Sequence, residues 1–225
     1  MNFHSQNVVA GIDGARGEWV IALFDGTSMA WEVATDVESI LDRTGHCASV
    51  GVDMPLSMPS QGYRVSELEA KRFLGPARSS IFHTPTAAVL HAQSYEDACA
   101  ISRASTGKAI SKQTWFLLPG IRAWHEAHFD RERIVEVHPE CSFRVMQPGT
   151  AFASKKSGRG AGQRMKGLAL WIDPGNLADG LAELPAGPAL DDALDAAAAA
   201  WSAWRFGRSE HRVFGTADAT DRIVA

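Results

Sequence analysis

The sequence predicts an α/β fold whose mixed sheet begins with three antiparallel strands. Two apolar runs, residues 8–13 and 18–24, flank a short loop that contains glycines, which is typical of a β-hairpin. After the turn signal Asp25-Gly26, the run Met29–Val33 adds a third short strand. These segments form a β-meander, and helical patterns separate it from the strands that follow along the chain.

A helix and a fourth strand come after the meander. Thr35 or Asp36 can cap the helix, and Cys47–Val52 is a short buried strand that ends at Asp53. This order of elements resembles the opening of the ribonuclease H-like fold. In that fold the fourth strand lies parallel to the first, so the resemblance implies that Asp13 and Asp53 are neighbours.

The rest of the chain combines further helices with one more strand. Ile134–His138 is a strand that an acid, Glu136, interrupts, and residues 57–130 are expected to form an inserted helical region before it. The polar tail after Gly207 is expected to become ordered only by docking. The other helical patterns are Ser66–Leu74, Tyr95–Thr106, Lys112–Phe129 with a kink or break at Pro119-Gly120, Cys141–Met146, Arg164–Ile172 and Leu190–Arg205, with Asp173–Gly187 as a connector.

A length of 225 residues allows one large or two small domains, and we expect a single domain, residues 1–225. With 45% hydrophobic residues the chain has enough apolar material for a core, and its net charge of −4 does not provide the basic field of DNA-packaging proteins. Three widely spaced cysteines predict neither a disulfide framework nor a zinc site. No apolar run reaches the roughly 18 residues of a membrane-spanning helix, and the N-terminus has no apolar signal segment. We therefore expect a cytoplasmic protein without a membrane partner.

Acidic residues recur beside the predicted core elements. Asp13 and Asp53 end strands, Glu136 interrupts one, and Asp192 and Asp195 lie three residues apart on the last helix, where they can share a face. An acid at a buried strand end is costly unless it binds water, a metal or a donor. Clustered carboxylates repel one another, and Mg²⁺ or Mn²⁺ relieves the repulsion. The pattern predicts a site for one or two such ions among these acids, and we expect Asp13, Asp53, Glu136, Asp192 and Asp195 to be its catalytic residues.

Basic side chains offer contacts for a phosphate-bearing substrate. The candidates are Arg78, Lys155, Lys156 and Arg164, of which the last three lie in or beside a flexible stretch rich in Ser and Gly. Each can equally be a solvated surface charge, just as the aspartates of the last helix can serve only to cap it. His138 is either a proton shuttle or a structural histidine at a strand end.

The first hairpin supports a second functional interpretation. In sugar kinases and actin-like ATPases, which resemble this fold, the first hairpin holds phosphates, and Gly11-x-x-Gly14-x-x-Gly17 offers a comparable loop. The loop lacks the pattern G-x-x-x-x-G-K-[ST] and joins strand to strand rather than strand to helix. At 225 residues the chain is also short for two lobes. A nucleotide- or phospho-metabolite-binding protein, either ATPase or kinase-like or a sensor, therefore stays the alternative.

Seven segments are distinctive in their order along the chain. They are Gly11-Ile12-Asp13-Gly14, Val52-Asp53-Met54-Pro55-Leu56, Arg72-x-Leu74-Gly75, Arg78-Ser79-Ser80-Ile81-Phe82, Glu136-Val137-His138-Pro139-Glu140, Lys155-Lys156 and Asp191-Asp192-Ala193-Leu194-Asp195-Ala196. The set resembles a prokaryotic family, the domain of unknown function 429, whose members are regarded as predicted nucleases of ribonuclease H-like fold. Likeness to Holliday-junction resolvases of that fold implies that the metal-binding acids fall on Asp13, Asp53, Asp192 and Asp195.

These observations together predict a metal-dependent nuclease that hydrolyses phosphodiester bonds in DNA or RNA. In this hypothesis Asp13 bridges two ions, and Asp53 with Asp192 or Asp195 completes their coordination. The basic residues hold phosphates of the nucleic acid. The oligomeric state stays open, with a homodimer among the alternatives.

Overall fold

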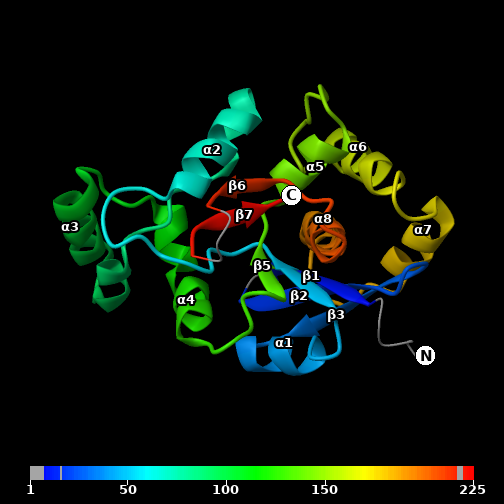
Figure 1. Ribbon diagram of the computed structural model, residues 1–225, viewed down its shortest axis with the longest axis horizontal. Helices are drawn as coiled ribbons and strands as arrows, with labels where there is room; N and C mark the ends of the chain where they lie inside the picture. Colours follow the sequence, from blue (N-terminus) through cyan, green and yellow to red (C-terminus); the bar gives the residue numbers. More distant parts are fainter. Residues whose placement is uncertain (1–7, 16, 217–219) are drawn as a thin grey trace.

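A computed structural model describes residues 8–15, 17–216 and 220–225 and places a five-stranded sheet near the middle of the molecule (Figure 1). Its strands are β1 (Val9–Ala15), β2 (Glu18–Phe24), β3 (Met29–Ala34), β4 (Ser49–Val52) and β5 (Ile134–Glu136), in the order β3-β2-β1-β4-β5. The first three strands are antiparallel neighbours, whereas β4 lies parallel to β1 and β5 lies parallel to β4. The predicted mixed sheet is confirmed, and its topology is consistent with a ribonuclease H-like fold.

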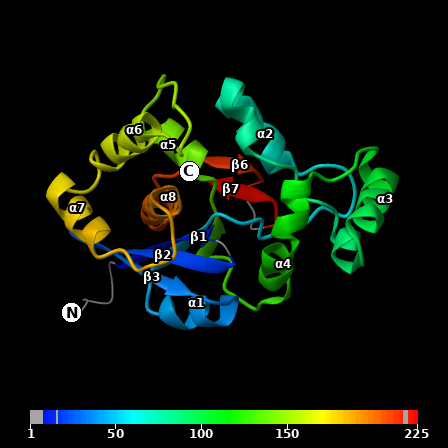
Figure 2. The same ribbon diagram turned by 180° about the vertical axis from the view of Figure 1, so that it is seen from behind.

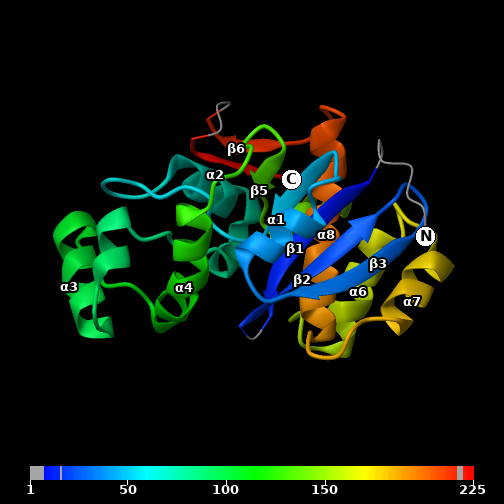
Figure 3. The same ribbon diagram turned by 90° about the horizontal axis from the view of Figure 1, so that it is seen from below.

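Helices cover both faces of the sheet, and almost every side chain of β1 and β2 is therefore buried. α1 (Val37–Arg43) lies on one face (Figure 3), and Asp36 caps it as predicted by accepting a hydrogen bond from the backbone of the first turn. α8 (Leu190–Gly207) crosses the other face over β1, β4 and β2. The sheet thus divides the core, with Ile12 in the cluster on the α1 side and Val20 in the cluster on the α8 side.

Small residues allow α8 to lie close against the sheet. A Cβ atom added to Gly11 would lie 2.0 Å from the carbonyl oxygen of Ala196, and one added to Gly51 would lie 2.4 Å from the carbonyl oxygen of Ala199. The whole run from residue 196 to residue 200 is buried. The alanine run of α8 and the two strand glycines therefore form one close contact between helix and sheet, which positions the start of α8 above the strand ends.

Between β4 and β5 the chain forms a helical region that reaches one end of the molecule (Figures 1 and 2). α4 continues through Pro119, where the sequence predicts a kink or break, because Leu118, Ile121 and Trp124 anchor it in the core on the α1 side. That residues 57–130 are an insertion in a single domain stays a prediction. The elements of the region are α2 (Val65–Leu74), η1 (Gly75–Ser80), η2 (Ala87–His91), α3 (Tyr95–Thr106) and α4 (Lys112–Glu126).

The segment after β5 is more helical than the sequence predicts. α5 (Pro139–Met146) includes the expected helical turn, but α6 occupies Gly158–Leu168 rather than 164–172. The sequence does not predict α6 at these residues because its glycines lower helix propensity. Gly160 is nevertheless required, since a Cβ added there would lie 2.0 Å from the carbonyl oxygen of Ser154. Within the described part of the chain, no helix is long and apolar enough to span a membrane.

The predicted connector and the predicted tail both contain regular structure. α7 (Pro174–Ala182) lies inside the connector, where Asp173 caps it ahead of a proline at its first position. After α8, the strands β6 (Val213–Gly215) and β7 (Arg222–Val224) pair with each other, and β7 forms a bridge from Val224 to Val137 just beyond β5. The tail is therefore a hairpin that extends the fold beside β5.

Candidate functional site

Two acids lie side by side where parallel strands end. β1 and β4 pair in register, with Ile12 opposite Val52, so that Asp13 and Asp53 follow at the same edge of the sheet. The backbone nitrogen of Asp53 donates a hydrogen bond of 2.8 Å to the carbonyl oxygen of Ile12. The sheet itself therefore holds these two carboxylates together.

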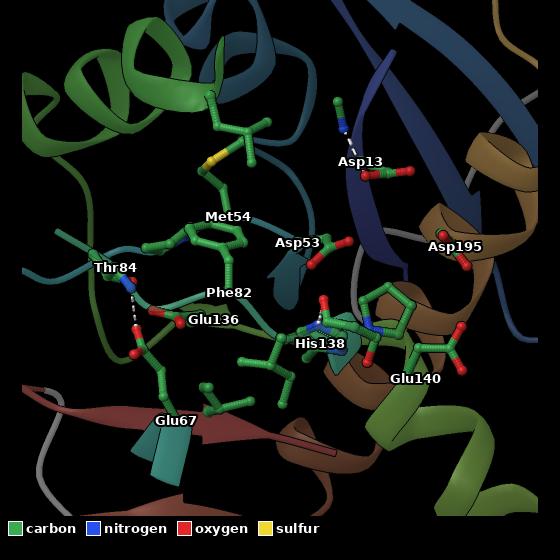
Figure 4. Close-up of a pocket in the computed structure, with 18 of the residues that line it drawn as sticks. Asp13, Asp53, Met54, Glu67, Phe82, Thr84, Glu136, His138, Glu140 and Asp195 are labelled. Carbon is green, nitrogen blue, oxygen red and sulfur yellow. Dashed lines mark hydrogen bonds between the residues drawn. The ribbon is translucent and has the colours of Figure 1, made fainter. Parts of the chain in front are cut away.

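Asp195, in α8, completes a cluster of three carboxylates (Figure 4). Asp13, Asp53 and Asp195 each offer one oxygen, and these oxygens all lie within 4.8 Å of one another. Asp13 is 8% exposed and Asp195 is 3% exposed. Three acids from separate elements thus converge on one point that can hold a divalent cation.

Burial and mutual repulsion make the ionised cluster costly. Burial raises the pKa of Asp13 well above its usual value, and the charge of Asp53 raises it further. Burial, and then repulsion by Asp195, raises the pKa of Asp53 to about 8, and burial raises the pKa of Asp195 to about 6. Among the described residues, Oδ1 of Asp195 has no hydrogen-bond partner although it is buried. An unpaired oxygen beside two further carboxylates fits a divalent ion, which would satisfy that oxygen and offset the repulsion.

Lys155 partly neutralises the cluster from the segment between α5 and α6. Its Nζ donates a hydrogen bond of 2.5 Å to Oδ2 of Asp195. Burial acts to lower the pKa of Lys155, but the Asp195 carboxylate raises it well above its usual value, so the ammonium group stays charged. The described ion pairs leave Asp13 and Asp53 without a direct cationic partner, and the pKa values of both stay raised despite the nearby Lys155 charge.

Asp192, the fourth predicted metal ligand, lies at the start of α8. Its Oδ2 accepts a hydrogen bond of 3.0 Å from the backbone nitrogen of Ala189, which closes the first turn of the helix. Asp192 lines the same cavity as the three clustered acids but is outside their cluster. This hydrogen bond supports a capping role for Asp192, whereas its role as a metal ligand stays a prediction.

Glu136 is held in a buried ion-pair network that sequence reasoning does not find. The guanidinium of Arg64 donates to both of its carboxylate oxygens, at 2.7 and 2.9 Å, and the backbone nitrogen of Leu56 donates at 2.8 Å. Arg64 also pairs with Asp221 at 3.1 Å. A lone arginine before a helix gives no signal of a partner this far along the chain. The catalytic role of Glu136 stays a prediction, and its observed contacts are those of a structural acid.

The four predicted phosphate contacts lie in different environments. Lys155 is at the acid cluster, and Arg78 and Lys156 are exposed. Arg164 is 2% exposed, and its guanidinium pairs with Glu140 and donates to a backbone carbonyl oxygen. Arg164 therefore stabilises adjacent segments of the same chain from a buried position. Contact with a substrate stays a prediction for all four residues.

A cavity of about 470 Å³ lies over the three clustered acids. Its volume is in the range of small-molecule pockets. The acids line one side of this cavity, and Met54 and Phe82 form an apolar wall on another side (Figure 4). The site can therefore receive a cation at the acids and an apolar group against the opposite wall.

His138 lines the same cavity between the acids and the apolar wall (Figure 4). Burial lowers its pKa to about 4, so the imidazole is neutral near pH 7. Nε2 lies 3.4 Å from the carbonyl oxygen of Ser80, while Nδ1 is buried without a hydrogen-bond partner among the described residues. A neutral imidazole in this position can relay a proton or can orient a bound group.

The raised pKa values predict that the protein without metal loses stability as pH rises. An aspartate carboxyl has a usual pKa of 3.8, so a folded-state pKa of about 8 for Asp53 means that the folded state holds this proton more tightly than the unfolded state. This contribution is lost between about pH 4 and pH 8. In a chelator, the melting temperature at pH 8 is expected to be lower than at pH 5 by at least about 3 °C.

Asp53→Asn, which removes the titrating group, is expected to lessen this decrease in melting temperature. Mn²⁺ is expected to raise the melting temperature of the unsubstituted protein at pH 8 by binding only the folded state. Differential scanning calorimetry of both proteins measures each effect. An equal decrease in both proteins, or no response to Mn²⁺, would contradict the assignment of the cluster.

Comparison with known proteins identifies one family. The model of a family described as "Protein of unknown function (DUF429)" matches residues 11–220. Comparisons with curated proteins and with solved structures give no match. The matched range includes all three clustered acids and Lys155.

Proposed function

The chain belongs to the family of proteins of unknown function DUF429, and we propose that it is a metal-dependent nuclease that hydrolyses phosphodiester bonds in nucleic acid. The observation that supports this most is the convergence of Asp13, Asp53 and Asp195 within 4.8 Å in a cavity wall. Mg²⁺ or Mn²⁺, as one or two ions, suits an all-carboxylate donor set. Such an ion supplies an activated water and stabilises charge on the phosphate.

The protein's own residues prepare this chemistry in distinct ways. Asp13, Asp53 and Asp195 would hold the cation. Lys155 keeps Asp195 ionised and oriented through its 2.5 Å contact. His138, neutral and in the same cavity, is placed to move a proton. Asp192, at the edge of the cavity, is available as a ligand to a second cation.

The nuclease proposal predicts cleavage that depends strictly on a divalent cation. Purified protein is incubated with single-stranded and duplex DNA and RNA of defined sequence, in Mg²⁺, in Mn²⁺ and in EDTA. We expect cleavage of at least one of these in Mn²⁺ or Mg²⁺ and none in EDTA. Absence of cleavage under every condition, by protein that binds Mn²⁺ in calorimetry, would contradict the nuclease and leave only a metal-binding protein.

One observation favours a second candidate, a nucleotide- or phospho-metabolite-binding protein. The cavity of about 470 Å³ has a size suited to a single small ligand, and its wall of Met54 and Phe82 suits an apolar ring. Calorimetry with ATP and with short oligonucleotides, each with and without Mn²⁺, distinguishes the two. Tight ATP binding without oligonucleotide cleavage would favour the second candidate.

A further inference from the structure

A second cavity, of about 270 Å³, adjoins the acidic one and has the opposite character. Ser79, Glu140 and Lys155 line both cavities, so the two share a boundary. Among the described residues that line the second cavity, the cationic side chains are Arg144, Lys155 and Arg164, and Glu140 is the one acid. The first cavity, in contrast, is lined mainly by carboxylates among its charged groups.

Arg144 is the charged group of this second cavity that has no partner among the residues that the structure describes. It lies on α5 and is half-buried, and no described hydrogen bond or ion pair involves its guanidinium. Its Nε is buried without a hydrogen-bond partner in the described part of the chain. A buried guanidinium nitrogen without an acceptor costs free energy, and an anionic ligand that accepts from this side chain would remove that cost.

The neighbouring charges favour an anion rather than oppose it. The carboxylate of Glu140 forms an ion pair with Arg164. The Lys155 ammonium, which pairs with Asp195, lies on the boundary between the two cavities. No described hydrogen bond involves the hydroxyl of Ser79, which lies on η1 at the same boundary. A guanidinium and a hydroxyl are suitable donors for phosphate oxygens.

We propose that the second cavity binds a phosphate group that flanks the scissile one in the same substrate strand, with Arg144 as its main contact. This inference rests on the proposed nuclease function, because it places the scissile phosphate at the acids. The boundary residues Ser79 and Lys155 lie between the two phosphates. The substrate class is thus a strand, or a strand end, that carries a phosphate adjacent to the cleaved bond.

The test compares three thymidine dinucleotides in Mn²⁺: one without a terminal phosphate, one with a 5′-phosphate and one with a 3′-phosphate. We expect one phosphorylated form to have the lowest KM, and Arg144→Gln to raise that KM roughly tenfold while leaving the KM of the unphosphorylated form unchanged. Arg144→Lys keeps the positive charge but loses the planar guanidinium group that can donate two parallel hydrogen bonds. Its KM for the phosphorylated form is expected to lie between those of the unsubstituted protein and of Arg144→Gln. Arg159→Gln, at an exposed position of α6 outside both cavities, removes the same charge and is expected to change nothing.

Each result bears on one proposal. Cleavage without any advantage from a terminal phosphate would overturn the subsite but not the nuclease, and so would an equal effect of Arg159→Gln. If no dinucleotide is cleaved, calorimetry with inorganic pyrophosphate in EDTA decides. Binding that Arg144→Gln weakens would support an anion site independent of catalysis, and binding that is absent or unaffected would overturn it. Unchanged melting temperatures show that the variants are folded.

Discussion

Asp13→Asn is expected to abolish metal-dependent cleavage and, at the same time, to stabilise the protein in the absence of metal. Asparagine keeps the oxygen that accepts the 2.8 Å hydrogen bond from the backbone of Gly14 but removes the charge that a cation needs. Because changes even to residues that only support metal ligands reduce activity by about 10- to 100-fold, we expect a loss of at least about 100-fold in rate.

The gain in stability follows from the same electrostatics. Burial and the charge of Asp53 raise the pKa of Asp13, so ionised Asp13 opposes folding. In EDTA at pH 8 the melting temperature of the variant is expected to exceed that of the unsubstituted protein, and this excess is expected to shrink as pH falls towards 3.8, the usual pKa of the carboxyl. Opposite changes in activity and stability separate a functional acid from a structural one.

A matched control is Asp179→Asn, at an exposed position of α7. It removes one carboxylate of the same kind outside the cavity and is expected to change neither rate nor melting temperature. Rates come from single-turnover cleavage in Mn²⁺, and melting temperatures come from scanning calorimetry. If Asp13→Asn cleaves normally, or unfolds at a lower temperature in EDTA at pH 8, the cluster is not a metal site.

The elements that the sequence predicts well are those whose signal is local. Alternating and continuous apolar runs mark β1 to β4, and the helix 95–106 is found within its predicted bounds. The convergence of Asp13 and Asp53 depends only on two strands and their parallel register, which the resemblance to a known fold supplies. The position of Asp195 depends on structure, because a run of alanines on α8 and two strand glycines set its height above the sheet.

The features that the sequence does not predict depend on contacts between distant segments. α6 contains several glycines, whose low helix propensity is overridden because the adjoining loop needs the space. The pairing of Arg64 with Glu136, and the buried placement of Arg164, arise from contacts between segments far apart in the sequence, which no periodicity describes. The division of Asp192 and Asp195 into a capping acid and a clustered acid is likewise a matter of three-dimensional position.

Gly11→Ala is expected to be the most destabilising of the substitutions considered, by about 3 kcal/mol or more. Its Cβ would lie 2.0 Å from the carbonyl oxygen of Ala196 and from the backbone nitrogen of Ala200. Both atoms belong to the backbone of a buried helix, so α8 has to shift as a unit away from the sheet. Because α8 also carries Asp195, such a shift would move one acid away from the other two.

The control lies three residues further along the same strand. Gly14→Ala adds the same methyl group, but its nearest neighbour would be a ring carbon of Trp19 at 3.8 Å, an ordinary van der Waals distance. We therefore expect Gly14→Ala to change the free energy of unfolding by less than about 1 kcal/mol. Urea denaturation of both variants measures the difference, and Mn²⁺ binding by Gly11→Ala, in the folded fraction, is expected to weaken. Equal stability of the two variants would show that α8 does not lie against β1 as closely as described, and the position of Asp195 above the strand ends would then lack its physical basis.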